Sequence, residues 1–193
     1  MPSLAFELAF GLALGFSLTV PPGPMNAYIA AQAVRSGRRG ILSGMGAMSA
    51  DAVLGTAVFL LSAAVDLGAY AREIYAVGAV VMAYFGLRLL LRRGAAETAP
   101  VGDARVYTTA LGLGLANPFQ IFWWLTAGLA FAYLGGAALL AGLFGAIAVW
   151  IVAFPLAIRT GAERSARAAE VITVLSGTAM LAFASYFAFL AAT

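Results

Sequence analysis

The sequence predicts an all-α integral membrane protein with six transmembrane helices, arranged as two inverted three-helix repeats, with helices 1 and 4 broken at proline motifs. Three observations lead to this prediction: the composition, six long apolar runs and a short internal repeat. Of the 193 residues, 63% are hydrophobic and 10% are charged, whereas soluble domains are roughly 45–50% apolar and about 25% charged. A soluble domain of this length could not bury so much apolar surface.

The composition also excludes several function classes. The chain has no Cys and no His, which excludes thiol redox relays, Cys/His zinc sites and haem held by either residue, and it disfavours soft metals as substrates. We expect no cofactor. Every basic residue is Arg, and the formal net charge is +3. In a membrane protein this charge marks cytoplasmic loops rather than a nucleic-acid site. The first residues, MPSLAFE, lack a basic region and argue against a cleaved signal peptide.

The six apolar runs each reach or approach the ~20 residues that a spanning helix needs. They cover 4–34, 40–64, 74–91, 107–133, 137–158 and 171–191. The separators are RSGRR (35–39), the stretch 66–73, RRGAAETAPVGDAR (92–105), YLGG (133–136) and RTGAERSARAAE (159–170). We predict a single transmembrane transporter domain over 1–193, with a first repeat at 1–93, a linker at 94–104 and a second repeat at 105–193.

The placement of arginine predicts the orientation of these spans. Ten of the eleven arginines lie in or beside the first, third and fifth separators, and only Arg72 lies elsewhere. The positive-inside rule places these three loops in the cytoplasm. We therefore predict a multi-pass protein of the cell (inner) membrane whose N- and C-termini are both extracytoplasmic.

The two halves of the chain resemble each other. PGPMNAY (22–28) aligns with ANPFQIF (116–122), and GAVVMAYFG (78–86) aligns with GTAMLAFAS (177–185). Each half contains three predicted spans, which is an odd number, so the halves insert with opposite orientations. This inverted-repeat plan is common in secondary transporters.

The first aligned segment breaks its helix in the middle of an apolar run. Pro21, Pro22 and Pro24 cannot donate backbone hydrogen bonds, and broken backbone at this depth is tolerated only inside protein or beside a water-filled cavity. Pro24 suits the first turn of a restarting helix. The amides of 25–27 would then point into the gap at a positive dipole end, and the carbonyls of 17–20 would face them.

The second aligned segment predicts a weaker copy of this break, at Asn117 and Pro118, with amides from Phe119 and Gln120. Pro24, Asn117 and Asp51 each lie 11 or 12 residues from the arginine that bounds their span. At ~1.5 Å per helical residue, these positions lie roughly 16–18 Å from the cytoplasmic edge of a hydrocarbon core that is ~30 Å thick. Both breaks and the acid are therefore expected near one midplane level.

Amides, carbonyls and one acid at the same level suit a zwitterion, with its carboxylate on the restarting helix and its ammonium near Asp51. The predicted substrate-binding residues are Pro22, Gly23, Pro24, Met25, Asn26, Asp51, Asn117, Pro118 and Gln120. Because burial disfavours a charged carboxylate, Asp51 is also the predicted proton-coupling residue. Asp51 lies on a face of small residues that should pack inward. Two alternatives remain open: a protonated structural Asp51, and proline kinks without a ligand.

Other conspicuous residues predict structural roles. Trp123 and Trp124 are expected in the aromatic belt at the outer interface, and Trp150 either lines the cavity or packs in the core. Two GxxxG segments, 11–15 and 40–44, indicate close helix packing or the face of a homodimer. Pro155 is expected to end or bend the fifth helix.

These motifs also carry a family resemblance. GFSLTVPPGPMNAYIAAQAVRSGRRGILSGMGAMSADAVLG (15–55) resembles the first half of the lysine exporter (LysE/RhtB) family of amino-acid exporters, with a Gly-rich first helix ending in PGP, a basic loop, spaced glycines and an Asp in helix 2. GLGLANPFQIFWW (112–124) resembles the second, NP-containing segment of the family. Many members have Lys after this NP, where the present chain has Phe119. The resemblance spans nearly the whole chain and implies ion-gradient-driven export of amino acids or related metabolites.

The predicted function is therefore secondary-active export of an amino acid or related small zwitterionic metabolite, by alternating access and with coupling to protons or another ion. The expected partners are this substrate and the lipid bilayer, with no nucleic acid, and the protein is not expected to be an enzyme. One alternative is a divalent metal-ion exporter of the same broad superfamily, which would need more intramembrane carboxylates. Another is a non-transporting membrane assembly protein, which would need larger loops or tails.

Overall fold

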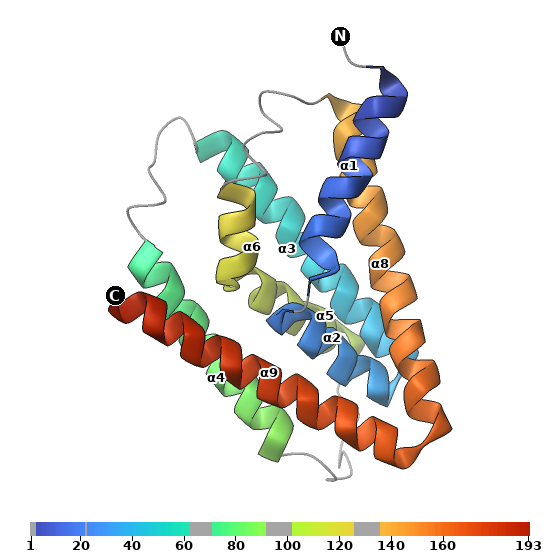
Figure 1. Cartoon of the computed structure of the whole chain (residues 1–193), viewed down its shortest axis with the longest axis vertical. Helices are drawn as coiled ribbons and strands as arrows, with labels where there is room; N and C mark the ends of the chain where they lie inside the picture. Colours follow the sequence, from blue (N-terminus) through green and yellow to red (C-terminus); the bar gives the residue numbers. More distant parts are fainter. Residues whose placement is uncertain (1–2, 22, 62–70, 92–101, 126–135) are drawn as a thin grey trace.

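The computed structural model describes residues 3–21, 23–61, 71–91, 102–125 and 136–193. These residues form eight helices and no strand (Figure 1). The helices are α1 (Leu4–Thr19), α2 (Pro24–Arg35), α3 (Gly37–Leu61), α4 (Ala71–Leu91), α5 (Asp103–Leu115), α6 (Pro118–Trp123), α8 (Ala137–Arg164) and α9 (Ala166–Ala192). The all-α prediction is confirmed for the described residues.

Among the described residues, three helical segments are long and apolar enough to cross a membrane: Gly37–Leu60, Ala137–Arg164 and Glu170–Ala192. The pair α1 and α2, whose axes differ by 77°, makes a fourth candidate if it forms one bent span. Large apolar side chains, such as those of Leu60, Val80 and Leu175, are exposed on the outside of the bundle, where a bilayer would cover them. The chain is a multi-pass membrane protein.

The remaining two predicted spans are not among these candidates. The span 74–91 lies wholly within α4, whereas the run 107–133 is described only in part, as α5 and α6, and continues beyond the described residues. Most of the predicted separators 66–73, 92–105 and 133–136 also lies outside the described residues. Six spans and an inverted repeat therefore stay a prediction.

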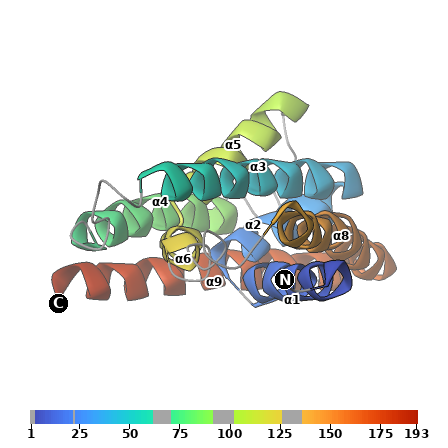
Figure 2. The same ribbon diagram turned by 90° about the horizontal axis from the view of Figure 1, so that it is seen from above.

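The helices pack in pairs that an inverted repeat would produce. α1 of the first half lies along α8 of the second, and α5, the counterpart of α1, lies along α3, the counterpart of α8. The third helices of the two halves, α4 and α9, pack against each other (Figure 1). Figure 2 shows the same layers from above, with α1 beside α8 and α9 along one side. Exchanging the halves leaves this set of three pairs unchanged.

Glycines permit the closest of these helix contacts. A Cβ atom at Gly11 or Gly15 would collide with the backbone carbonyls of Leu139 and Leu143 on α8. The glycines of 40–44 lie against residues of α2 and α8 in the same way. Close packing, one of the two roles predicted for the GxxxG segments, is confirmed, and both segments make their contacts within the chain. A homodimer stays a prediction that these two segments do not support.

α2 occupies the centre of the bundle. Its residues from Pro24 to Val34 are buried or half-buried, and only Arg35 is exposed, because α3, α8 and α9 all pack around it. Two apolar clusters flank it. The first contains Tyr28, Ala31, Ala79, Met82, Ala110, Leu113, Met180, Ala184 and Phe187, and the second contains Val58, Trp124, Leu139, Leu143, Ile147 and Ile151.

Two predicted separators are shorter than the sequence suggested. Between α2 and α3 only Ser36 is non-helical, and between α8 and α9 only Ser165 is, each with extended backbone. The predicted loops 35–39 and 159–170 are therefore wrong for most of their length. Arg, Ala and Glu are good helix formers, so these helices continue past the apolar runs. α8 also continues through the buried Pro155, which does not end it.

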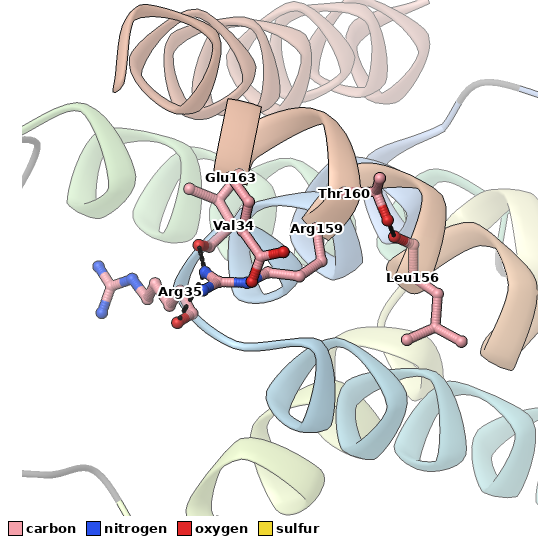
Figure 3. Close-up of polar contacts among 6 residues, drawn as sticks. All are labelled: Val34, Arg35, Leu156, Arg159, Thr160 and Glu163. Atoms are coloured by element: carbon pink, nitrogen blue, oxygen red, sulfur yellow. Dashed lines mark hydrogen bonds and ion pairs between the residues drawn. The ribbon is translucent and has the colours of Figure 1, made fainter. Parts of the chain in front are cut away.

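Arginine contacts join four helices near their ends. Arg159 of α8 donates from Nη1 to the carbonyl of Val34 at 2.7 Å and to that of Arg35 at 3.4 Å, at the C-terminus of α2 (Figure 3). Its Nε forms an ion pair with Glu163 at 2.6 Å. Arg38 at the start of α3 pairs with Asp103 at the start of α5, also at 2.6 Å. The described arginine-rich ends of these helices thus lie at the same end of the bundle, while the side of the membrane that they face stays a prediction.

Candidate functional site

The first helix break is held by one amide side chain. α1 ends at Thr19, and Asn26, in the first turn of α2, donates from Nδ2 to the carbonyls of Thr19 at 2.5 Å and Pro21 at 3.0 Å. The Asn26 Oδ1 accepts a hydrogen bond from Trp150 Nε1 of α8 at 3.1 Å. Asn26 therefore bonds the last carbonyl of α1. Of the carbonyls of 17–20 that were expected to face the gap, that of Thr19 is already bonded.

The N-terminus of α2 has no side-chain cap. Its N-cap residue is Gly23, and Pro24, the first helical residue, carries no N–H. The N–H groups of Met25 and Asn26 lie in the first turn, where a helix offers no acceptor of its own. The N–H of Ala27 instead donates to the Gly23 carbonyl at 3.0 Å, so the prediction that Ala27 presents its amide to the gap is wrong.

The second break is capped. Asn117 is the N-cap residue of α6, and its Oδ1 accepts a hydrogen bond from the Phe119 N–H at 3.2 Å. Its Nδ2 donates to Gln120 Oε1 at 3.0 Å. The predicted second break is present at Asn117 and Pro118, but the Phe119 amide is already bonded, so the prediction that this amide is offered to a ligand is wrong. Pro118 is buried, and a Cβ atom at Gly78 would collide with its ring.

Asp51 links α3 to this second break. Its Oδ1 accepts hydrogen bonds from Gln120 Nε2 and from Trp124 Nε1, both at 3.0 Å. The side chain of Asp51 is buried, with 3% of the residue exposed, and its Oδ2 makes no hydrogen bond to any residue that the structure describes. A chain of side-chain hydrogen bonds thus runs from Asn117 through Gln120 to Asp51.

The aromatic-belt prediction is wrong for Trp124. Its indole is buried against Gly55, where a Cβ atom would approach the ring to 2.7 Å. A buried indole N–H needs an acceptor, and Asp51 supplies it. The signal in the sequence was Gly55, one helical turn after Asp51, which leaves room for a large ring beside the acid.

One cavity of about 270 Å³ joins these parts. Seven of the nine predicted site residues line it: Gly23, Pro24, Met25, Asn26, Asp51, Asn117 and Gln120. Pro118 does not, and Pro22 lies outside the described residues. The expectation that both breaks and the acid meet at one level agrees with this placement. Trp150, for which the sequence left two roles open, also lines the cavity.

The apolar part of the lining was not predicted from the sequence. Met48, Phe119, Trp123 and Ile147 all contribute to it. Met48 precedes Asp51 by three residues and therefore lies on the same helix face, a signal that could have identified it. Ile147, on α8, could not have been found without knowing how the helices pack.

The charges of the cavity are few. Of the described residues that line it, Asp51 is the only one with an ionisable acid or base. No group of three or more Asp, Glu, His or Cys residues in the described part of the chain could hold a metal ion. The cavity thus combines one carboxylate, first-turn amides and an apolar wall, which can accommodate a small molecule with one cationic and one anionic group.

Comparison with known proteins gives one match. Residues 16–190 match the model of a protein family described as LysE type translocator. No curated protein and no solved structure matches the chain.

Proposed function

The chain belongs to the LysE type translocator family, and we propose that it is a secondary-active exporter of an amino acid or a related small zwitterionic metabolite. Family membership makes it a transporter. The observation that supports the narrower proposal is a cavity that is lined by residues of both helix breaks and by Asp51.

The two charges of a zwitterion have separate places in this proposal. The carboxylate binds at the N-terminus of α2, where Gly23 provides no side-chain cap and where the helix dipole favours an anion. The ammonium binds at Asp51, whose Oδ1 already accepts two hydrogen bonds and whose Oδ2 makes none within the described residues. The cavity has a volume of about 270 Å³.

Asp51 couples transport to protons in this proposal. A proton and a substrate ammonium compete for one carboxylate, so a proton entering from outside releases the amino acid there. The membrane potential supplies about 2.3 kcal/mol per charge per 100 mV. Asp51 lies in the first half of the chain and its donors Gln120 and Trp124 lie in the second. A change in the charge of Asp51 therefore alters a contact between the two halves, as alternating access requires.

The orientation is also proposed, with the arginine-rich ends of the bundle in the cytoplasm and both termini outside. An antibody against a C-terminal tag should then bind intact spheroplasts. Binding only after permeabilisation would contradict this orientation.

Two other functions make different demands on the same cavity. A divalent metal-ion exporter would need several carboxylates, and among the described lining residues only Asp51 has one. A non-transporting assembly protein would need no ligand in the cavity.

The deciding experiment is efflux from proteoliposomes preloaded with single members of an amino-acid panel, with a proton gradient imposed. Efflux of at least one amino acid, dependent on the gradient and absent from protein-free liposomes, supports the proposal. Efflux of a divalent metal without efflux of any amino acid would favour the metal-ion exporter. If neither class moves, the assembly protein is favoured.

A further inference from the structure

We infer that the transported amino acid has an uncharged, apolar side chain. This inference rests on the proposed function and narrows its substrate class. It follows from counting which polar groups of the cavity are still able to accept a partner.

The cavity provides for one cation. Asp51 is the only ionisable residue among the described lining residues, and two of the sites on its carboxylate are already used by Gln120 and Trp124. A basic amino acid would bring a second ammonium into the cavity without a second carboxylate. A buried charge without a partner is strongly disfavoured.

The cavity also provides for one anion. No Arg or Lys side chain is among the described lining residues, and Arg159 is engaged at the far end of α2 with the Val34 carbonyl. The uncapped N-terminus of α2 is the anion site in our proposal, and the α-carboxylate of the substrate would fill it. An acidic side chain would then have no counter-charge.

The neutral polar groups of the lining are paired among themselves. The hydroxyls of Ser17 and Thr19 donate to the carbonyls of Leu14 and Gly15, at 2.7 and 2.9 Å. The side-chain amides also donate within the protein: Asn26 to α1, Asn117 to Gln120, and Gln120 to Asp51. A hydroxyl or amide on the substrate side chain would therefore find few donors that are not already engaged.

The rest of the lining is apolar and adaptable. Met25 and Met48 line the cavity together with Phe119, Trp123 and Trp150, and thioether side chains adjust to irregular shapes. Phe119 is held by edge-to-face contacts with Phe183 and Phe187, with ring centroids 5.2 and 5.3 Å apart. Such a wall stabilises an apolar side chain by removing it from water.

The test uses counterflow, in which proteoliposomes filled with one unlabelled amino acid exchange it for the same labelled amino acid. Norleucine and lysine form a matched pair, because they share a straight aliphatic side chain and differ in the terminal ammonium. Methionine and glutamate form a second pair of similar size. We expect norleucine and methionine to exchange on the order of 100-fold faster than lysine and glutamate, a difference of about 2.8 kcal/mol at 1.4 kcal/mol per tenfold.

A variant should extend the specificity to lysine. Met48 precedes Asp51 by one turn on the cavity face of α3, so Met48→Glu adds a carboxylate where a substrate side chain would lie. We expect Met48→Glu to exchange lysine at least about tenfold faster than wild type and norleucine more slowly. Met48→Gln has the same shape without the charge, and it should not gain lysine exchange.

The outcomes separate the two proposals. If lysine or glutamate exchanges as fast as its apolar partner in wild type, the protein is still an amino-acid transporter but the inferred specificity is wrong. If Met48→Gln gains lysine exchange equal to that of Met48→Glu, the charge argument is wrong as well. If no amino acid exchanges in any variant, the proposed function itself fails.

Discussion

The two proline breaks occupy aligned positions in the two halves of the chain, yet they use their polar groups in opposite ways. At the first break, Asn26 bonds the carbonyl end of α1 and leaves the N-terminus of α2 without a side-chain cap. At the second break, Asn117 caps the N-terminus of α6 and donates a second hydrogen bond to Gln120, which in turn donates to Asp51. The first break thus leaves the first turn of α2 uncapped beside the cavity, and the second supports an acid.

The alignment of the halves gives the reason. Gly23 aligns with Asn117, and Asn26 aligns with Gln120. An amide side chain just before the helix can cap it, and glycine in the same position cannot. The proline interrupts the helix in both halves, but the neighbouring residue determines whether the new helix end binds its own side chain or remains available to a ligand.

The largest effect is expected at Asp51, the acid that the second break supports. Asp51→Asn keeps an oxygen that can accept from Gln120 and Trp124 but cannot exchange a proton. We expect proton-driven export to fall by at least about 100-fold, with an unchanged melting temperature of the purified protein. Asp103→Asn, which removes an exposed acid of an ion pair outside the cavity, is the control and should export normally. If Asp51→Asn still concentrates substrate under a proton gradient, Asp51 is a structural acid.

Removing the amide at each break should separate the roles of the two breaks. Asn26→Ala leaves the carbonyls of Thr19 and Pro21 and the N–H of Trp150 without their partner, so we expect a loss of stability of about 1–3 kcal/mol and a KM raised by about tenfold. Asn117→Ala should lower the free energy of unfolding by about 1 kcal/mol, because α6 loses its N-cap. It should mainly change the pH dependence of transport, because Gln120 then loses its bond. Identical kinetic effects in the two variants would show that the breaks are equivalent.

The smallest effect is expected from Trp124→Phe, which removes one of the two donors to Asp51 and keeps an aromatic ring beside Gly55. We expect a few-fold change in transport rate and a shift of its pH dependence towards higher pH, since a neutral hydrogen bond contributes about 1 kcal/mol. Trp123→Phe, at a neighbouring residue that makes no bond to Asp51 among the described contacts, should change the rate without moving the pH profile. Equal pH profiles for both variants would contradict the role of Trp124.

Much of this arrangement follows from the sequence. Prolines inside an apolar run predict a broken helix. Because the rise per helical residue is fixed, the spacing of Pro24, Asn117 and Asp51 from the flanking arginines predicts that the three residues lie at the same depth in the membrane. The small face of α3 predicts that Asp51 points inward. These inferences depend on local helix geometry, which follows from the spacing of residues along the sequence.

What the sequence did not predict depends on contacts between distant helices. The bond from Trp124 to Asp51 requires the second half to fold over Gly55, and the contact from Arg159 to Val34 joins α8 to α2. Asn26 was predicted as a ligand through its backbone, but its side chain could have turned to either helix. Hydrogen bonds of this kind are selected by which acceptor the packing brings close, and hydropathy does not contain that information.

The most direct test of the account is to give the first break the cap that the second break has. Gly23 has extended backbone, with φ −157° and ψ 172°. Among the described residues, an added Cβ atom would meet only the Pro21 carbonyl, at 3.9 Å. Gly23→Asn can therefore be accommodated, and Gly23→Ala controls for the added bulk. We predict that the KM for substrate rises by about tenfold in Gly23→Asn relative to Gly23→Ala, while the melting temperature is unchanged or slightly higher, because a cap contributes a few tenths of a kcal/mol relative to glycine. An equal KM in the two variants would contradict the claim that the uncapped N-terminus of α2 binds the substrate carboxylate.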